Sequence, residues 1–531
     1  MPYSIKNKFL LFLFLKIFWA FSQQNITEKP EIIQIIHADY ATTNAKYPGK
    51  QLLSGNVKIE HNQALLFCDK AIVDKKENTA IAVGNVRLIQ GDTLEMRSGY
   101  LSYDGNKSFA KALDDVFLRD PEMNLQTDTL MFDRQKQITY YTSGGIIRDS
   151  INELKSKIGK YFLQEKKYSF INNVHIDNPD YQLDSYHLDY FTDTGVSNFY
   201  GPTKIYNDHS YIYSEKGHYD SQNKISWFVK NAFIKDRHTT IRGDSLYYEQ
   251  KNSFATADNN VVLHDSINNV WIFSNYGEYW GKKDSIEVTR KPLIVSINEK
   301  DSLYIRAKKF IAAGKKSKRK LWGYDKVRFF SNDFSGKADS LYRNDSLRIL
   351  KLMKNPVIWN GNSQITGNLI RIKNDSLNQA DSLYIPKDVF IIQKDSAGFN
   401  QIKGKKLYGK FKNNKIQKID ILGNTEVIYY LRDEEQALTG IEKNKSSKIS
   451  ITFDNTSEIE TVRFYQKVDG TVYPPNKLKN KQFKGFNWRG KEIIRSKEDV
   501  LEGYIPIFKA QTLQKETYLP DEIKMEKQKR D

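Results

Sequence analysis

The chain has 531 residues, which is long enough for several ordinary domains or for one long repeat array. Only 13 residues are Pro and no long apolar run follows residue 21, so membrane-spanning helices and wholesale disorder are both disfavoured. The formal net charge is +18, and the single cysteine, Cys68, excludes an intramolecular disulfide.

The first 22 residues have the features of a secretory signal peptide. Lys6 and Lys8 precede an apolar stretch at residues 9–21, and Ala20-Phe21-Ser22 resembles a cleavage site. The stretch is shorter than the roughly 20 residues of a spanning helix, and Lys16 interrupts it. We therefore expect residues 1–22 to be cleaved, and retention as a membrane anchor is the alternative.

The predicted export limits the partners that the positive charge of the chain could attract. Removal of the three lysines in the signal lowers the charge from +18 to near +15. An exported basic protein does not usually meet nucleic acid, so we expect no nucleic-acid partner. The expected acidic partners are phosphorylated or acidic glycolipids, or a membrane surface.

A repeat of about 30 residues follows a polar lead-in at residues 23–44, where a strand is expected at residues 32–37. The clearest copies open with Gly55-Asn56-Val57 and Gly84-Asn85-Val86, and most intervals are 28 to 33 residues. A fixed period of this size is typical of a solenoid or another stacked array. The predicted opening residues are Val57, Val86, Val116, Ile146, Val174, Ile205, Ala232, Val262, Leu293, Val327, Val357, Val389 and Val427.

Each repeat alternates apolar and polar residues, which predicts three short strands and an all-β fold. The second strand is introduced by Asp-Ser/Thr-Leu, as at residues 92–94, 128–130, 244–246, 301–303, 339–341 and 381–383. Asp and Ser bond their own backbone in turns, so we interpret these Asp residues as turn formers. A calcium-binding Asp ladder is the alternative, although the glycine-rich nonapeptide is absent.

No pattern typical of a catalytic or metal site is found. The eight histidines include no HExxH, and one cysteine cannot build a cysteine-rich zinc site. His209 and His218 are the closest pair, and surface positions are the expected interpretation. Cys68 lies in an alternating strand and is expected to pack as a small apolar group. We therefore predict a protein without enzymatic activity or cofactor.

A basic run, Lys315-Lys316-Ser317-Lys318-Arg319-Lys320, lies between two apolar segments and is predicted to be a hairpin tip. A solvated turn is the simpler interpretation. The alternative is a headgroup contact, in which Lys315, Lys316, Lys318, Arg319 and Lys320 meet phosphates on a lipid or glycan.

The repeats resemble the OstA-like domain, which is shared by LptA, a periplasmic lipopolysaccharide transport protein, and by the N-terminal part of LptD. The resemblance rests on Gly55-Asn56-Val57, Gly84-Asn85-Val86, residues 92–96, residues 101–104 and residues 128–133. It is strongest over residues 45–200 and weaker over residues 201–435. Residues 436–508 are expected to be a divergent β region, and residues 509–531 a charged tail. The chain is longer than LptA-type proteins and lacks the barrel of LptD.

The resemblance implies an elongated β-jellyroll, V-shaped in section, whose apolar groove holds the acyl chains of lipid A. Burying one chain of about 12 methylenes is worth on the order of 10 kcal/mol. It also implies strand pairing with other Lpt-type bridge or outer-membrane components. From the alternation, the groove candidates are Val57, Ile59, Val86, Leu88, Leu94, Met96, Leu101, Val116, Leu118, Leu130 and Phe132.

These expectations describe a lipopolysaccharide-binding transport component in the periplasm or associated with the outer membrane. The first alternative is a structural or adhesin-type β-solenoid with a closed, dry core. The second is a glycan-active enzyme on a β-helix, which would need neighbouring carboxylates on one exposed face. Single, regularly spaced Asp residues do not supply them.

Overall fold

The computed structural model describes residues 32–501, apart from residues 44, 46, 62–63, 92–93, 122, 298–301, 316–317, 377–378, 414, 455–458 and 479–480. The predicted signal peptide and charged tail therefore lie outside the described residues. Within them the chain is almost entirely antiparallel β-structure, with one helix of five residues, α1 (Lys497–Leu501). The predicted all-β fold is confirmed.

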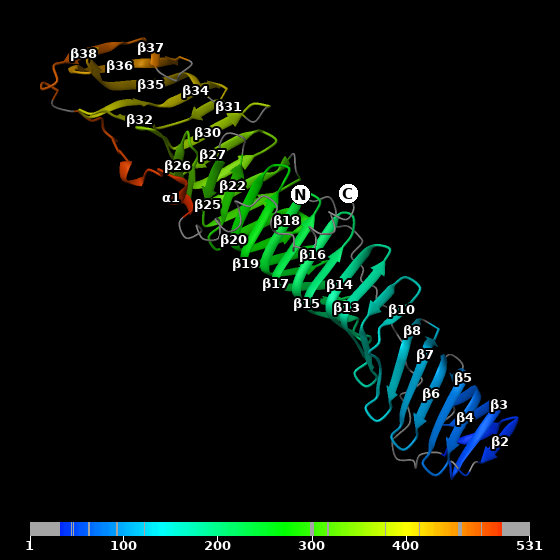
Figure 1. Ribbon diagram of the computed structural model, residues 1–531. Helices are drawn as coiled ribbons and strands as arrows, with labels where there is room; N and C mark the ends of the chain where they lie inside the picture. The colour runs from blue at the N-terminus through cyan, green and yellow to red at the C-terminus, as the bar shows by residue number, and fades with distance from the viewer. Residues whose placement is uncertain are drawn as a thin grey trace. The chain divides into compact units, whose positions relative to one another are not determined.

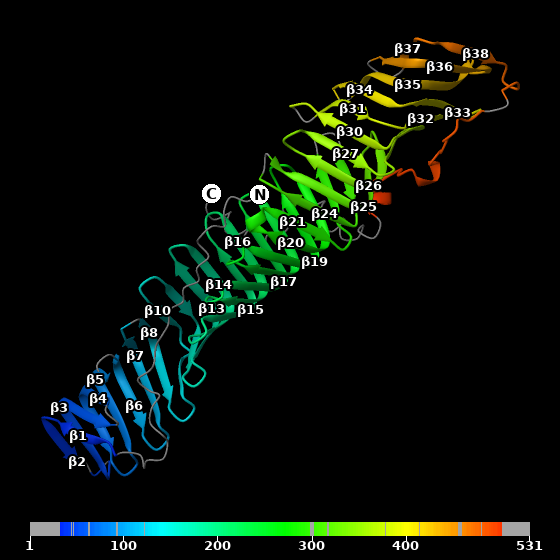
Figure 2. The same cartoon turned by 180° about the vertical axis from the view of Figure 1, so that it is seen from behind.

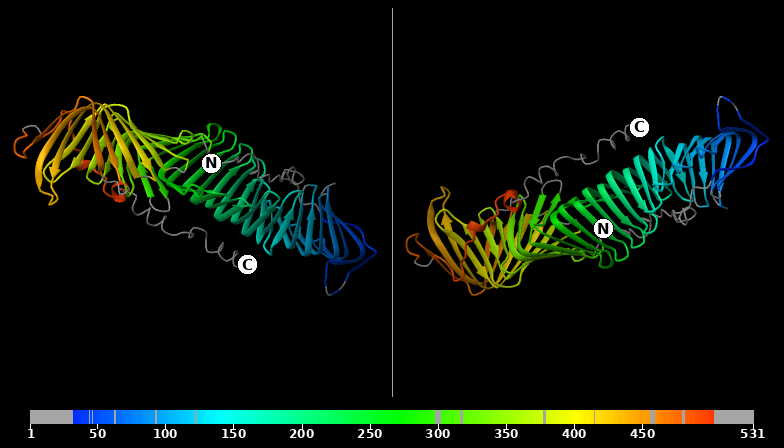
Figure 3. Two further views of the ribbon diagram at one scale, coloured as in Figure 1. Left: turned by 90° about the horizontal axis from the view of Figure 1, so that it is seen from above. Right: turned by 90° about the horizontal axis from the view of Figure 1, so that it is seen from below.

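The chain divides into two compact units, residues 2–255 and residues 256–531, called here the N-terminal and C-terminal units. Within each unit consecutive strands lie side by side along a ribbon (Figure 1, Figure 3). The strands of the N-terminal unit are β1 (Gln34–His37), β2 (Tyr40–Thr43), β3 (Lys50–His61), β4 (Ala64–Asp74), β5 (Thr79–Gln90), β6 (Leu94–Asp104), β7 (Phe109–Arg119), β8 (Asn124–Asp133), β9 (Ile138–Tyr141), β10 (Gly145–Arg148), β11 (Glu153–Ser156), β12 (Ile158–Phe162), β13 (Lys167–Asn178), β14 (Tyr181–Phe191), β15 (Val196–Tyr206), β16 (Ser210–Asp220), β17 (Ile225–Asp236) and β18 (Thr239–Glu249).

β19 (Phe254–Asp265) includes the boundary between the units. The further strands are β20 (Val270–Trp280), β21 (Ser285–Thr289), β22 (Leu293–Ile297), β23 (Ser302–Arg306), β24 (Lys309–Ala313), β25 (Lys320–Phe330), β26 (Ser335–Asn344), β27 (Ile349–Met353), β28 (Val357–Asn360), β29 (Ser363–Thr366), β30 (Leu369–Asn374), β31 (Ala380–Ile385), β32 (Val389–Lys394), β33 (Phe399–Gly404), β34 (Lys406–Lys412), β35 (Lys415–Arg432), β36 (Leu438–Phe453), β37 (Ile459–Tyr465) and β38 (Asp469–Tyr473).

A pair of left-handed residues bends every second strand in the middle. In β3, Gly55 and Asn56 have φ of 74° and 44°, and the two residues stand opposite the single residue Asp69 of β4. A Cβ atom on Gly55 would lie 2.3 Å from Oδ2 of Asp39, so only glycine fits that position. The Asn56 amide donates to the same Asp39 oxygen at 3.0 Å, which ties neighbouring strands together at the kink.

The kinks divide the strands into two arms. Arm A includes residues 57–61 of β3 and 64–68 of β4, and arm B includes residues 50–54 and 70–74. In the C-terminal unit one core joins Phe310 and Leu341 of arm B to Val327 and Phe329 of arm A, so the arms pack on each other. A sheet folded on itself in this way is the β-jellyroll that the resemblance implies.

Three predictions about the repeat are wrong in detail. Gly55-Asn56-Val57 does not start a strand but lies inside one, so the clearest repeats have two long bent strands, not three short ones. Elsewhere, as between β21 and β22, the kink separates two short strands. Glycine and asparagine favour left-handed backbone in turns and in kinks alike, and the sequence does not distinguish the two. Some predicted opening residues do not directly follow a kink but stand one or two positions farther along the chain. These six residues are Ile146, Ile205, Val262, Leu293, Val357 and Val427.

The Asp-Ser/Thr-Leu phrase is also placed differently. Asp128, Asp244 and Asp339 lie inside β8, β18 and β26, each opposite a kink, and not in turns. Asp92 and Asp301 lie outside the described residues.

A small polar residue recurs on the strands that face the kinks, and it was not predicted. Its side chain donates to the backbone carbonyl two residues later across the bend, as Ser98 does to Tyr100 and Ser185 to His187. This hydrogen bond satisfies a carbonyl that the bend removes from the ladder. The residues that share this contact are Cys68, Ser98, Thr127, Ser156, Ser185, Ser274 and Ser446.

After β38 the chain runs back along the C-terminal unit as an irregular segment, residues 474–501, called here the strap (Figure 1, Figure 2). Its Leu478 and Phe483 pack on Ile392 and Tyr430, and Val500 in α1 joins a second cluster. That second cluster combines arm A and the strap, and its buried members are Val262, Phe273, Leu293, Val295, Val357, Trp359, Ile494, Val500 and Leu501.

Two buried glutamines fix the strap. Gln364 donates to the carbonyl of Asn487 and accepts from the amide of Arg489, both at 2.8 Å. Gln401 donates to the carbonyl of Lys481 at 2.8 Å and accepts from the amide of Phe483 at 3.0 Å. Both side chains are fully buried, so these four hydrogen bonds determine where the strap crosses arm A.

Candidate functional site

A row of aliphatic side chains runs through arm A of the N-terminal unit from one strand to the next. Ile59 pairs with Leu66, Leu66 with Leu88, and Leu88 with Met96. The row continues through every paired strand as Leu118, Leu125, Ile147, Leu154, Ile176, Leu183, Ile205, Ile212, Ile234 and Ile241. We call it the aliphatic row.

The facing row in arm B combines large and small residues. It begins Leu53, Ala71, Ala82 and Leu101, and from Tyr141 onward aromatic rings and glycines take part. Cβ atoms on Gly145 and Gly159 would lie 2.5 and 2.3 Å from the Tyr141 ring, so these glycines make room for it. The Tyr141 hydroxyl is satisfied by Ser156 at 2.7 Å. The rest of the row is Ala112, Leu130, Gly159, Phe170, Leu188, Phe199, Gly217, Phe228 and Leu246.

The predicted groove residues all belong to the inner faces of the two arms. Nine are buried, and Leu88 and Phe132 are half-buried. Ile59, Leu88, Met96 and Leu118 lie in the aliphatic row. Leu101 and Leu130 lie in the facing row, Val57, Val86 and Val116 follow the kinks, and Leu94 and Phe132 lie farther from the kinks.

Many members of the aliphatic row were missed from the sequence, among them Leu66, Leu125, Ile176 and Leu183. The available signal for Leu66, Leu125 and Leu183 is their position two residues before a small polar residue opposite a kink, as Leu66 stands before Cys68. Ile176 instead stands two residues after Val174, which directly follows a kink. That signal becomes visible only once the kinks are recognised as lying inside strands.

Several titratable side chains of the interior are in their neutral form at physiological pH. Burial raises the pKa of Cys68 to about 11 and the pKa values of Tyr141 and Tyr161 to about 12. Within the described part of the chain no group of three or more His, Cys, Asp or Glu side chains could hold a metal ion. The aliphatic and aromatic side chains of the inner faces can therefore contact apolar molecules.

The C-terminal unit contains a similar row in its own arm A. Ile272 pairs with Ile294, which pairs with Ile305, and the row reaches Val427. Its other members are Phe329, Gly336, Ile358, Ile365, Ile391 and Ile402. The row then ends, since Val427 pairs with the buried Asn444.

A hollow of about 500 Å³ lies elsewhere, beside the kinks of β7 and β13. Asp115, Asp128, Lys155, Lys157 and Asn173 are part of its lining. Charged and amide groups do not suit acyl chains, so this hollow is separate from the apolar interior.

The basic run is a hairpin tip, as predicted, because Ala313 of β24 pairs with Lys320 of β25. Lys315, Lys318 and Lys320 are exposed and Arg319 is half-buried, whereas Lys316 lies outside the described residues. Whether the run contacts a headgroup stays a prediction.

Each unit also ends in a strand pair with one free side among the described residues. β1 and β2 pair with β3, and β37 and β38 pair with β36. Ile36 and Tyr40 are exposed at the first edge, and Val462 and Val472 at the second. Unpaired backbone at such an edge can accept another strand.

Among the described residues no helix has the length and apolar character needed to span a bilayer.

Comparison with known proteins supports the resemblance drawn from the repeats. Residues 30–186 match the family of OstA-like proteins, and no curated protein matches the chain. Among solved structures, one match is LptH from Pseudomonas aeruginosa, described as the LptA homologous periplasmic component of the lipopolysaccharide transport device. The two sequences are 11% identical, and the match covers 20% of this chain and 81% of the LptH chain, with a TM-score of 0.19. The N-terminal part of this chain, residues 30–186, is therefore OstA-like, as its Gly-Asn-Val repeats indicate.

Proposed function

We propose that the chain is a non-enzymatic transport component of the cell envelope, and that its apolar interior holds the acyl chains of lipopolysaccharide on the way to the outer membrane. The observation that carries the proposal is the aliphatic row of the N-terminal unit, which lies within and beyond the OstA-like residues 30–186. Neighbouring strands are about 4.8 Å apart, so a chain sliding along the row keeps meeting equivalent side chains.

This arrangement suits transport for an energetic reason. Each buried methylene is worth about 0.8 kcal/mol wherever it lies along the row. A ligand can therefore be held firmly and still move with little change in free energy. The aliphatic row itself carries no charge that would stop the ligand at one strand.

The proposed partners follow from the strand edges. Other Lpt-type components would add a strand beside β1 and β2 or beside β37 and β38. The location that goes with this function is the periplasm, with association to the outer membrane at one end. In the same proposal Lys315, Lys318, Arg319 and Lys320 contact phosphates of the headgroup, together with Lys316.

Photo-crosslinking in living cells tests the proposal. A crosslinking amino acid is placed at Leu88 or Phe132, which are half-buried on the inner faces, and at Lys58 or Arg87, which lie on the outer face. Capture of lipopolysaccharide at the inner pair alone is the expected result. Equal capture at the outer pair would show adventitious contact, and capture at neither, in folded protein, would overturn the proposal.

A structural solenoid with a dry core is the second candidate. The observation that favours it is the depth of the interior, where Ile176 and Leu183 are fully buried. Mutation of Ile176 to Asp distinguishes the two functions, with Leu88→Asp at a half-buried position of the same row as the matched variant. In a dry core both variants lose stability in proportion to burial, whereas in a lipid carrier Leu88→Asp loses bound lipid while the protein stays folded.

A further inference from the structure

The positive charge of the chain is concentrated in one unit. Residues 1–255 hold 31 Lys and Arg against 30 Asp and Glu, whereas residues 256–531 hold 51 against 34. The C-terminal unit therefore carries a net charge of +17 and the N-terminal part +1. The strands repeat the same structure in both units, so the fold itself does not require this asymmetry.

Part of the excess lies along the row of kinks, which forms an outward ridge. In the N-terminal unit the left-handed kink positions are mostly Gly, Asn and Asp, such as Asn85 and Asp115. In the C-terminal unit several of these positions hold cations, beside others such as Asn259, Asp388 and Asn424, although a lysine has no conformational advantage at positive φ. The cations are Arg290, Lys291, Lys326, Lys354 and Lys467.

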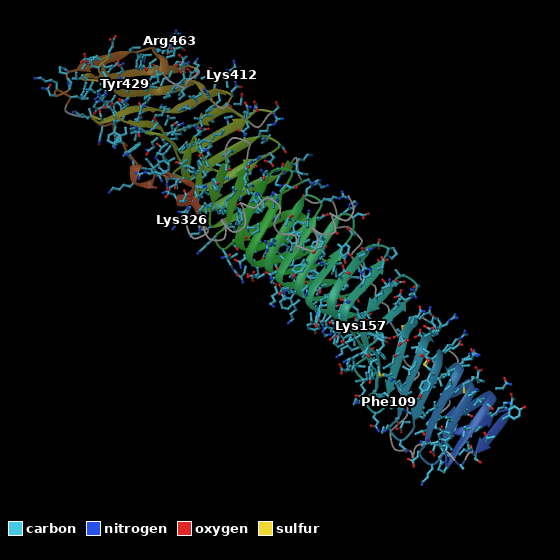
Figure 4. The ribbon with its side chains drawn as sticks, viewed as in Figure 1. Phe109, Lys157, Lys326, Lys412, Tyr429 and Arg463 are labelled. Atoms are coloured by element: carbon cyan, nitrogen blue, oxygen red, sulfur yellow. The ribbon has the colours of Figure 1, made fainter. Side chains whose placement is uncertain are left out.

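These ridge lysines extend into solvent. Lys291, Lys326, Lys354 and Lys467 are all exposed, and Lys326 projects outward from the ribbon in Figure 4. Lys354 approaches Asp339 at 3.5 Å, but its side chain remains 77% exposed, so the pair is strongly screened.

The strap lies beside this ridge. Arg306 donates to the carbonyl of Val500 at 3.0 Å, Arg489 to that of Asn355 at 3.1 Å, and Lys403 to that of Lys484 at 2.9 Å. Asn355 is itself a kink residue. Arg306 and Lys403 each lie two residues before a lysine, Lys308 or Lys405, whose backbone amide donates to the carbonyl of a kink residue, Asp325 or Gly423. The strap therefore contacts the C-terminal unit at or near the ridge at three places.

The apolar side chains of the strap pack against arm A, so its charged side chains face solvent. Leu478, Phe483, Ile494, Val500 and Leu501 face arm A. The exposed cations on the strap are Lys477, Lys481, Lys484, Lys491, Arg495 and Lys497. With the ridge lysines they form one band, which we call the basic band.

We propose that the basic band is a docking surface for a bilayer that carries anionic lipid headgroups. The charge is spread along a ridge as flexible, mostly lysine side chains, which suits a laterally extended anionic surface better than one phosphate group. The separation between kinks, two strands or about 10 Å, is close to the screening length of about 8 Å at physiological salt, so the charges act additively. The proposal does not depend on lipopolysaccharide transport.

Co-sedimentation with vesicles tests the proposal with the full chain. The probes are vesicles of phosphatidylcholine alone and of phosphatidylcholine mixed with phosphatidylglycerol, at low and high salt. The ridge variant carries Lys291→Asn, Lys326→Asn, Lys354→Asn and Lys467→Asn. Asparagine tolerates the left-handed backbone and is found at equivalent kinks such as Asn56, so this variant should fold.

A matched control removes the same charge from the N-terminal unit. It carries Lys166→Asn, Lys224→Asn, Lys230→Asn and Arg237→Asn, which are cations at left-handed positions there. A strap variant, with Lys477, Lys484, Lys491 and Lys497 changed to Gln, tests the other half of the band.

The wild-type chain and the control should bind anionic vesicles at low salt and release them at high salt. They should not bind neutral vesicles. The ridge variant should bind on the order of several hundredfold more weakly, because each of its four lost lysines is worth about fivefold near an anionic surface. Equal weakening by the control would show an effect of net charge alone and overturn the proposal. Salt-sensitive self-association without vesicle binding would also overturn it, in favour of a second copy as the partner.

These readouts contain no lipopolysaccharide. A failure here therefore leaves the crosslinking test of the proposed function unaffected, and the reverse also holds.

Discussion

The two units have the same kinked strands and a similar row of aliphatic side chains, yet their arms are buried differently. In the N-terminal unit many outward positions of arm A are polar, such as Lys58, Arg87 and Lys204, and the apolar ones, such as Phe117, are not buried. In the C-terminal unit the equivalent positions include Leu293, Val295 and Trp359, all buried beneath the strap. Arm A is therefore one of two packed layers in the N-terminal unit and the middle of three layers in the C-terminal unit. The difference depends on its outward residues, which are every second residue of each strand.

The sequence pattern changes accordingly. A strand with one wet face alternates, whereas a strand buried on both faces is a continuous apolar run. Leu293-Ile294-Val295 and Val389-Phe390-Ile391-Ile392 are such runs, and all but the half-buried Ile391 are buried. The difference shows that the strap is a structural requirement of the C-terminal unit.

The largest effect is expected from removing the strap. A chain that ends after Tyr473 leaves the outer face of arm A in water, so the C-terminal unit should unfold or aggregate. Limited proteolysis should then digest residues 256–473 rapidly and leave residues 32–255 protected. A chain that ends after Leu501 keeps the strap and is the control. Unchanged protection of residues 256–473 would contradict this account of the two units.

A single substitution beneath the strap should have the next largest effect. Trp359 is 1% exposed, and truncation of a buried tryptophan to alanine costs about 3–5 kcal/mol. The matched variant in the N-terminal unit is Arg148→Ala at an exposed outward position, which should cost less than about 1 kcal/mol. Urea titrations of both variants measure the difference, and equal losses would show that the outer faces are equivalent.

Loss of a buried hydrogen bond beside a kink should destabilise both units equally, because the kinks have the same structure in each. Ser185 bonds Thr203 at 2.8 Å and Ser446 bonds Thr425 at 2.6 Å, each pair buried beside a kink. Ser185→Ala and Ser446→Ala should each lower the free energy of unfolding by about 1 kcal/mol. A loss confined to one unit would mean that the kinks differ in a way that their hydrogen bonds do not reveal.

The smallest effect is expected from a charged turn and depends on pH. The Arg432 guanidinium, 2.7 Å from Asp395, lowers the pKa of that carboxyl. A lowered folded-state pKa stabilises the protein above the unfolded value of about 3.9, and this contribution is lost as pH falls through the folded value. Asp395→Asn should therefore lower the melting temperature at neutral pH and flatten its decline in acid. Asp104→Asn removes the partner of the exposed Lys107 and should change the dependence of the melting temperature on pH less.

The two proposals concern different faces of the molecule. The proposed lipid path uses inward side chains such as Leu88, and the basic band uses outward ones such as Lys326. A variant of one face should therefore leave the other function intact, which allows the two to be separated in one set of proteins.

Much of the repeat was predictable because it depends on local pattern. The period of about 30 residues, the all-β fold and the inward set from Val57 to Phe132 follow from alternation and glycine spacing. The kinks were predicted as strand starts because left-handed Gly-Asn pairs occur in turns as well as in bends. Residues such as Leu66 and Leu183 were missed because membership of the aliphatic row depends on the register between strands.

The sequence by itself determined the class of fold, the repeat and the polarity of each face, since strand periodicity is local. Only the tertiary structure decided that residues 474–501 return to cover arm A. Gln364 and Gln401 look like ordinary polar strand residues, and their contacts at Asn487 and Lys481 are 123 and 80 residues away. Contacts over such distances depend on how the whole unit packs, and no local pattern encodes them.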